Sequence, residues 1–234
     1  DIFGENANGL TESEVVEGLK TALQVGTDTS VAVTSELNGY YKDEVIKILL
    51  PEEAQVIQEY ADDVGLTSEV DKFIESMNRS AEDAADKAKP IFTSAITDMS
   101  ISDGWEILNG SNPEALDQSS EFDSTAATGY LISTTYNSLY DAFQPDIQSS
   151  LDKELVGSAS TNEIWETITT TYNAWALIKG KDQVDTDLDR YVTEKALDGL
   201  FYKVGQEEKE IRRDPGKWIE TKVGDILNKV FGDN

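Results

Sequence analysis

The chain has 234 residues, of which 46 are acidic and 19 basic, so its formal net charge is −27. It contains no cysteine and no histidine, which excludes thiol and imidazole nucleophiles, Ser-His-Asp triads, disulfides and zinc sites built from those side chains. Carboxylate, lysine, tyrosine and hydroxyl chemistry remains open, as does a hard cation held by oxygen atoms.

Apolar residues recur along most of the chain with the period of an α-helix. Thr11 and Glu14 have the spacing of a capping box and predict a helix that begins there. Pro51 predicts the start of another helix, which Gly65 would end. The predicted helical segments are residues 11–26, 51–64, 67–88, 90–99, 102–108, 126–155, 160–175, 188–204 and 219–230.

Several boundaries in this pattern have a specific signal. Pro90 either starts a new helix or kinks the preceding one, and Ser102 or Asp103 could cap the short helix that follows. Ser160 and Glu163 form a second capping box. Residues 31–33 (Val-Ala-Val) are interpreted as a helix end, and the chain offers no convincing pair of strands.

These elements predict an all-α fold. We expect one compact, bundle-like domain of about eight or nine helices over residues 11–234. Residues 1–10 are expected to form a flexible N-terminal segment. The polar, acidic stretch near residues 111–124 is interpreted as a surface insertion.

Short strings along the chain resemble one bacterial family in their order and spacing. They lie at residues 76–82 (SMNRSAE), 89–92, 99–103, 107–110, 126–131, 191–201, 207–212 and 229–232. Together they resemble the family called domain of unknown function 4197 over nearly the whole chain. The resemblance implies an exported, often lipoprotein-like envelope protein, periplasmic or anchored to the outer membrane. It implies no established activity.

Arg79 is one of only four arginines and follows an apolar helix face. Its planar guanidinium could bind a carboxylate or phosphate of a ligand. The alternative is an ion pair within the chain, with an acid such as Asp103, Asp189 or Glu208. We take six residues as candidate ligand-binding residues: Asn78, Arg79, Tyr130, Tyr172, Glu208 and Arg212.

Glu208 and Arg212 are four residues apart, a spacing that stabilises helices. A functional alternative makes Glu207 or Glu208 a general acid or base, as in hydrolases that use two carboxylates. Tyr130 and Tyr172 could line a pocket, although aromatic residues at helical spacing are more often part of the core.

A charged loop precedes the helix that begins near residue 188. Spaced carboxylates on a loop suit Ca²⁺, which accepts six to eight oxygen ligands. The alternative is that Asp187 or Asp189 caps the following helix. The candidate metal ligands are Asp182, Asp185, Asp187 and Asp189.

The favoured hypothesis is a non-enzymatic envelope protein that binds a small ligand, a lipid or a protein partner. The first alternative is a calcium-binding protein that uses the acidic loop, and the second is a carboxylate-based hydrolase. We expect no cofactor other than a possible Ca²⁺.

Nucleic acid is excluded as a partner because no basic stripe is present. No transmembrane segment is expected, because no apolar run approaches 18 residues. The chain begins with Asp1, so we expect a processed product whose precursor carries a signal peptide.

Overall fold

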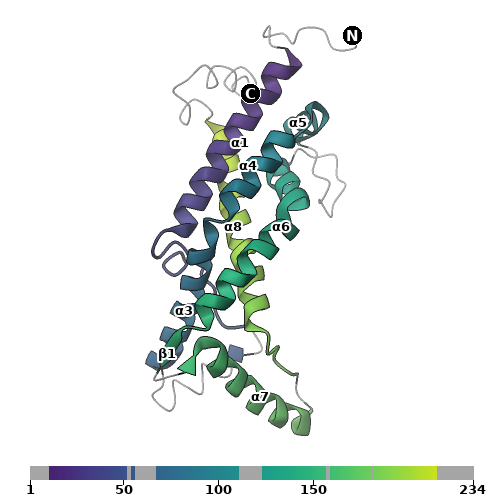
Figure 1. Ribbon diagram of the computed structural model, residues 1–234. Coiled ribbons are helices and arrows are strands. Elements are labelled where there is room, and N and C mark those ends of the chain that lie inside the picture. Colours follow the sequence, from purple (N-terminus) through teal and green to yellow (C-terminus); the bar gives the residue numbers. More distant parts are fainter. Residues whose placement is uncertain are drawn as a thin grey trace. The chain divides into compact units, whose positions relative to one another are not determined.

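The computed structural model describes residues 11–51, 54–55, 67–110, 123–156, 159–180 and 182–214 (Figure 1). Helices dominate these ranges, so the predicted all-α class is confirmed. The described helices are α1 (Glu12–Ser35), α3 (Thr67–Ala85), α4 (Ala88–Asp98), α5 (Ile101–Leu108), α6 (Ala126–Leu151), α7 (Thr161–Lys179) and α8 (Leu188–Arg213).

The described helices are slightly fewer than the eight or nine predicted. The helix predicted at 51–64 lies outside the described residues apart from positions 51, 54 and 55, and the one predicted at 219–230 lies wholly outside them. Every other predicted helix has a counterpart. Residues 31–33 fall within the last turns of α1, which confirms that they belong to the end of a helix.

A short antiparallel strand pair was not expected from the sequence. β1 (Glu154–Val156) pairs with β2 (Ala159–Ser160), so the helix predicted to continue to residue 155 instead ends at Leu151. Ser160 has the extended backbone of an N-cap residue, with φ −81° and ψ 168°. Strands of two and three residues are too short to show an alternating pattern, so the sequence prediction was wrong here.

Capping residues define most of the helix starts. The Oγ1 of Thr11 accepts a hydrogen bond from the Glu14 amide, and the Glu14 carboxylate accepts one from the Thr11 amide. The capping box of Ser160 and Glu163 is also confirmed. For α5 the prediction was wrong: Ser100 is the N-cap and forms the box with Asp103, because the backbone is already helical at residue 101.

Pro90 lies in the first turn of α4, so it begins a new helix and does not kink α3. Proline is tolerated there because an amide in the first turn has no acceptor within the helix.

The described residues form two compact units. Unit 1 contains residues 11–32, 88–110, 123–139 and 201–214, and unit 2 contains residues 33–51, 54–55, 67–87, 140–156, 159–180 and 182–200. The single domain over 11–234 stays a prediction. Residues 1–10 and most of the predicted insertion near 111–124 lie outside the described residues.

Each unit has its own apolar core. In unit 1, Phe92 of α4 meets Phe201 of α8 edge-on, with the ring centroids 5.9 Å apart. In unit 2, Phe73 of α3 stacks on Trp165 of α7 at 5.7 Å. Apolar residues at helical spacing along the segment predicted at 188–204 are all buried on α8: Leu188, Val192, Ala196, Leu200, Phe201 and Val204.

The buried face of α7 differs from the prediction by one position. Helical spacing of the apolar residues favours a face through Ile164, Ile168, Tyr172 and Trp175. The first three are only half-buried, and the side chain of Trp175 lies outside the part of the chain that the structure describes. Among the side chains of α7 that the structure describes, the buried ones are Thr161, Trp165, Thr169 and Ala176. Thr169 can be buried because its hydroxyl donates to the Trp165 carbonyl oxygen at 2.7 Å.

Among the described residues, no helix combines the length and the apolar character needed to cross a bilayer.

Candidate functional site

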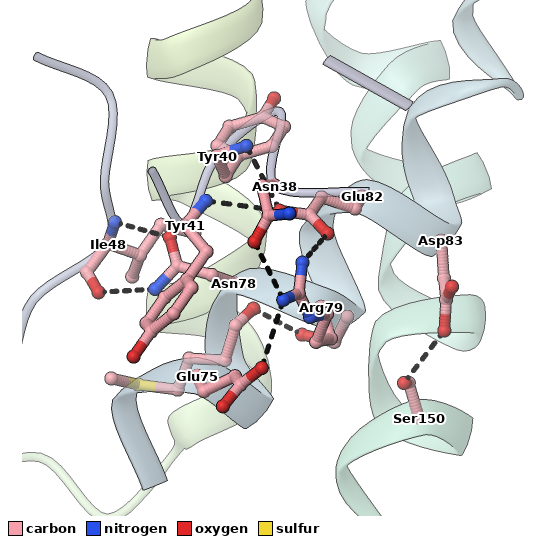
Figure 2. A network of polar contacts seen from close by, with 12 residues as sticks. Asn38, Tyr40, Tyr41, Ile48, Glu75, Asn78, Arg79, Glu82, Asp83 and Ser150 are labelled. Atoms are coloured by element: carbon pink, nitrogen blue, oxygen red, sulfur yellow. Dashed lines mark hydrogen bonds and ion pairs between the residues drawn. The ribbon is translucent and has the colours of Figure 1, made fainter. Parts of the chain in front are cut away.

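The string at residues 76–82 lies in the middle of α3 and forms a polar cluster in unit 2 (Figure 2). Asn78 and Glu82 are one turn apart, so they share a face of the helix. Both are buried. A buried polar group is costly unless it is hydrogen-bonded, so their partners define what this cluster does.

Asn78 binds the backbone of Ile48 in both directions. Its Oδ1 accepts from the Ile48 amide at 2.8 Å, and its Nδ2 donates to the Ile48 carbonyl at 2.8 Å. The second hydrogen of Nδ2 goes to the carbonyl of Ile74, also at 2.8 Å. The side chain therefore acts on Ile48 as a neighbouring β-strand would.

Glu82 holds the chain at residues 40 and 41. Its Oε1 accepts from the amides of Tyr40 at 3.1 Å and Tyr41 at 3.0 Å. Its Oε2 accepts from Nη1 of Arg79 at 2.6 Å. The carboxylate thus has both an opposite charge and backbone donors, which is what a buried charge requires.

Arg79 completes the cluster. Its Nη2 donates to Oδ1 of Asn38 and to Oε1 of Glu75, both at 2.9 Å. Asn38 has φ +75°, a left-handed conformation that asparagine tolerates better than most residues. The predicted ion pair within the chain is confirmed. The suggested acids were wrong: the actual partners, Glu75 and Glu82, are helical neighbours on the same face.

α8 holds the same segment through two tyrosines. The hydroxyl of the fully buried Tyr40 donates to the Ala196 carbonyl at 2.7 Å. The hydroxyl of Tyr191 donates to the Leu49 carbonyl at 2.8 Å. Burial, together with the nearby Glu82 carboxylate, raises the pKa of Tyr40 far above its usual value.

We call residues 36–50 the held segment. In its C-terminal half, buried and exposed side chains alternate: Ile46, Ile48 and Leu50 are buried, whereas Val45 and Leu49 are exposed. Leu37, Val45 and Leu49 are 74%, 64% and 55% exposed. The buried polar groups of α3 therefore fix the backbone of a segment that presents large apolar side chains to solvent.

A second polar cluster lies in unit 1. The Glu208 carboxylate accepts from the amides of Ala127 and Thr128, at 3.0 and 2.8 Å, and so caps the start of α6. Arg212 pairs with it at 2.7 Å, which confirms the predicted pair. Nη2 of Arg212 also donates to the Ile107 carbonyl at 3.1 Å.

The six candidate ligand-binding residues do not form one group. Asn78 and Arg79 share the cluster on α3, and Glu208 and Arg212 share the cluster in unit 1. The Tyr130 hydroxyl donates to the Ala95 carbonyl at 3.3 Å, also in unit 1. Tyr172 is half-buried on α7 in unit 2. A ligand role for these residues stays a prediction, as does the carboxylate-based hydrolase.

The predicted metal loop has side-chain contacts at three of its four aspartates. Oδ1 of Asp187 accepts from the Arg190 amide at 3.0 Å, which confirms it as a cap of α8. Asp185 pairs with the Arg190 side chain, and Asp189 accepts from Asn162 at 2.9 Å. Burial raises the pKa of Asp189. Asp182 is exposed.

The described part of the chain contains no group of three or more acidic side chains placed to hold a metal ion. The calcium hypothesis stays a prediction.

The held segment was not predicted from the sequence. The Asn38-Gly39 pair is a turn signal, and Glu82 belongs to the string at residues 76–82, so the sequence marks each of them separately. The hydrogen bonds between Glu82 and the backbone after this turn could not be predicted, because they join residues about 40 positions apart.

A family model described as "Protein of unknown function (DUF4197)" matches residues 9–232. No curated protein and no solved structure matches the chain.

Proposed function

The chain belongs to the DUF4197 family of proteins of unknown function, and we propose that it is a non-enzymatic envelope protein that binds a protein partner through the held segment. One observation carries the proposal: the polar side chains of α3 are used to fix a backbone that exposes Leu37, Val45 and Leu49. The envelope location is supported by the family resemblance of the sequence.

Scattered exposed apolar side chains are normal on proteins. Leu37, Val45 and Leu49 are instead concentrated on a single segment of 15 residues, which is more typical of an interaction site. Asn78 and Glu82 hold that segment in place before any partner arrives. A pre-ordered surface loses less conformational entropy on binding, so the cluster on α3 favours recognition by a rigid surface.

The charges around Arg79 support a structural role in place of catalysis. Its guanidinium is shared among Glu75, Glu82 and Asn38, and it lies 5.3 Å from the centre of the Tyr41 ring. A ligand carboxylate would have to compete with two carboxylates already in place. The motif is therefore better explained as a support for the held segment than as a binding pocket.

Photocrosslinking in the native host tests this proposal. A benzoylphenylalanine in place of Leu37 or Leu49 is expected to yield one protein adduct of defined mass. The matched control is the same group in place of Leu177, which is equally exposed at 74% but lies on α7. Absence of an adduct from the held segment, or the same adduct from all three positions, would contradict the proposal.

Once the adduct is identified, its affinity can be measured with purified proteins. Leu37→Asn is expected to weaken the complex at least tenfold without lowering the unfolding midpoint of the chain, because Leu37 contributes little to the core. Leu177→Asn should leave the affinity unchanged.

A further inference from the structure

Two stretches of the chain share the tripeptide Leu-Asn-Gly, residues 37–39 and 108–110. In an asparagine–glycine pair the glycine amide nitrogen can attack the asparagine side-chain carbonyl, because glycine has no Cβ and leaves the backbone free to adopt the required conformation. Such pairs are the ones most prone to deamidate without an enzyme. A third pair, Asn8-Gly9, lies outside the described residues. Because the tripeptide is the same in the two described pairs, the structure around each pair decides which of them reacts.

The pair of Asn38 and Gly39 is held at both of the reacting groups. Oδ1 of Asn38 accepts a hydrogen bond from Nη2 of Arg79 at 2.9 Å (Figure 2). The Gly39 amide donates to the Glu36 carbonyl at 2.9 Å. A Cβ on Gly39 would collide with the carbonyl oxygen of Val33, so this part of the backbone has little room to rotate. Attack on the Asn38 side chain would therefore require two hydrogen bonds to break within a tightly packed turn.

The pair of Asn109 and Gly110 lies at the end of α5, in unit 1. Asn109 is the C-cap residue of this helix, and it is exposed. In the part of the chain that the structure describes, no residue forms a hydrogen bond with its side chain. The amide of the buried Gly110 donates to the Ile107 carbonyl at 3.1 Å, a bond at the end of a helix, where the backbone frays most easily. Once this bond opens, the Asn109 side chain can turn toward the Gly110 nitrogen.

We propose that Asn109 is a site of spontaneous deamidation, whereas the same tripeptide at Asn38 stays intact. The Gly110 nitrogen forms a bond with Cγ of Asn109 and gives up its proton, and the side-chain nitrogen leaves as ammonia. Water then opens the cyclic imide. Attack of water at Cγ gives aspartate, and attack at the backbone carbonyl carbon gives isoaspartate. The overall change is hydrolysis of the side-chain amide, so it requires water and no redox partner.

Either product changes the end of α5. It places a carboxylate at the C-terminal end of a helix, where the helix dipole disfavours a negative charge. Isoaspartate also lengthens the backbone by a carbon atom before Gly110, whose amide and carbonyl bind Ile107 and Asp123. Nη2 of Arg212 donates to the same Ile107 carbonyl, so the modification lies close to the polar cluster that caps α6.

Peptide mapping of the full chain by mass spectrometry tests the assignment. After incubation of the folded protein in mildly alkaline buffer, conversion at Asn109 is expected to be at least fivefold faster than at Asn38. The matched control is the same protein unfolded in guanidinium chloride, in which the two tripeptides should convert at similar rates. A difference confined to the folded protein comes from its structure and not from the local sequence.

An isoaspartate assay gives a second readout. A purified isoaspartate methyltransferase with labelled S-adenosylmethionine is expected to label the peptide that contains residue 109 in aged wild type. Asn109→Gln should remove this label, because glutamine closes the corresponding larger ring far more slowly. Asn137→Gln, on the exposed side of α6, should leave the label unchanged.

Three results would overturn the proposal: equal rates at the two pairs in the folded protein, faster conversion at Asn38, or no conversion at Asn109 during the time in which the unfolded chain converts. A label that persists on this peptide in Asn109→Gln would also overturn it. None of these results bears on the crosslink from Leu37, so the two proposals fail independently.

Discussion

At the scale of a single residue, the phenol of Tyr40 makes the stability of the folded protein depend on pH. Its buried hydroxyl donates to the Ala196 carbonyl, and burial together with Glu82 raises its pKa. The folded protein therefore favours the neutral phenol. This contribution is fully present below a pH of about 10, the usual tyrosine pKa, and decreases as the pH rises above it.

We expect Tyr40→Phe to lower the free energy of unfolding by about 1 kcal/mol at pH 7, through loss of one hydrogen bond. Between pH 9 and 11.5 the variant should lose less stability than the wild type, because it has no phenol to ionise there. Urea unfolding at each pH measures both effects. The exposed Tyr202→Phe serves as control, and an alkaline profile for Tyr40→Phe identical to that of the wild type would contradict the coupling.

At the scale of elements, α3 holds residues 36–50 through Asn78, Arg79 and Glu82. Asn78→Asp keeps the shape but loses both donors and places a carboxylate against the carbonyls of Ile48 and Ile74. We expect a loss of about 1–3 kcal/mol and hydrogen exchange at the Ile48 amide at least tenfold faster. Asn137→Asp, on the exposed side of α6, should change neither. Unchanged exchange at Ile48 would show that Asn78 does not hold the segment.

The contact between α8 and the held segment depends on a glycine. A Cβ at Gly199 would lie 2.7 Å from a ring carbon of Tyr40 and 3.1 Å from Cβ of Ile46. We expect Gly199→Ala to cost about 1–3 kcal/mol by overpacking. Gly205 on the same helix has no such neighbour closer than 3.6 Å, so Gly205→Ala should be neutral or stabilise by up to about 1 kcal/mol. Thermal unfolding of the two variants compares them directly, and equal effects would contradict this packing.

The same elements show what sequence could and could not predict. The stripes of α3 and α8 follow a regular apolar period, and the boxes at Thr11 and Ser160 depend on residues three positions apart, so local reasoning found them. The buried face of α7 includes Thr161 and Thr169. These polar residues interrupt the apolar pattern from which a buried helix face is predicted. The held segment depends on contacts between distant residues, such as Tyr40 with Ala196, and these leave no periodic signal.

At the scale of the whole molecule, the charge of −27 opposes compaction, because like charges repel. Salt screens this repulsion: the Debye length falls from about 10 Å at 0.1 M to about 3 Å at 1 M. We therefore expect the urea midpoint of unfolding to rise steadily with sodium chloride over this range. A midpoint that falls or stays constant would mean that attractive ion pairs, such as that of Arg79 with Glu82, balance the repulsion.

A comparison of calcium with magnesium distinguishes this general screening from binding at a specific site. The candidate site is the loop that contains Asp182, Asp185, Asp187 and Asp189. Screening depends on ionic strength, so calcium and magnesium chloride at equal ionic strength are expected to raise the midpoint equally. A specific site would instead produce a calcium effect that saturates below about 1 mM. It would also disappear in Asp185→Asn with Asp187→Asn, where asparagine can still cap α8. The local contacts of these aspartates with Arg190 lead us to expect the first result, whereas a saturable response would establish the loop as a cation site.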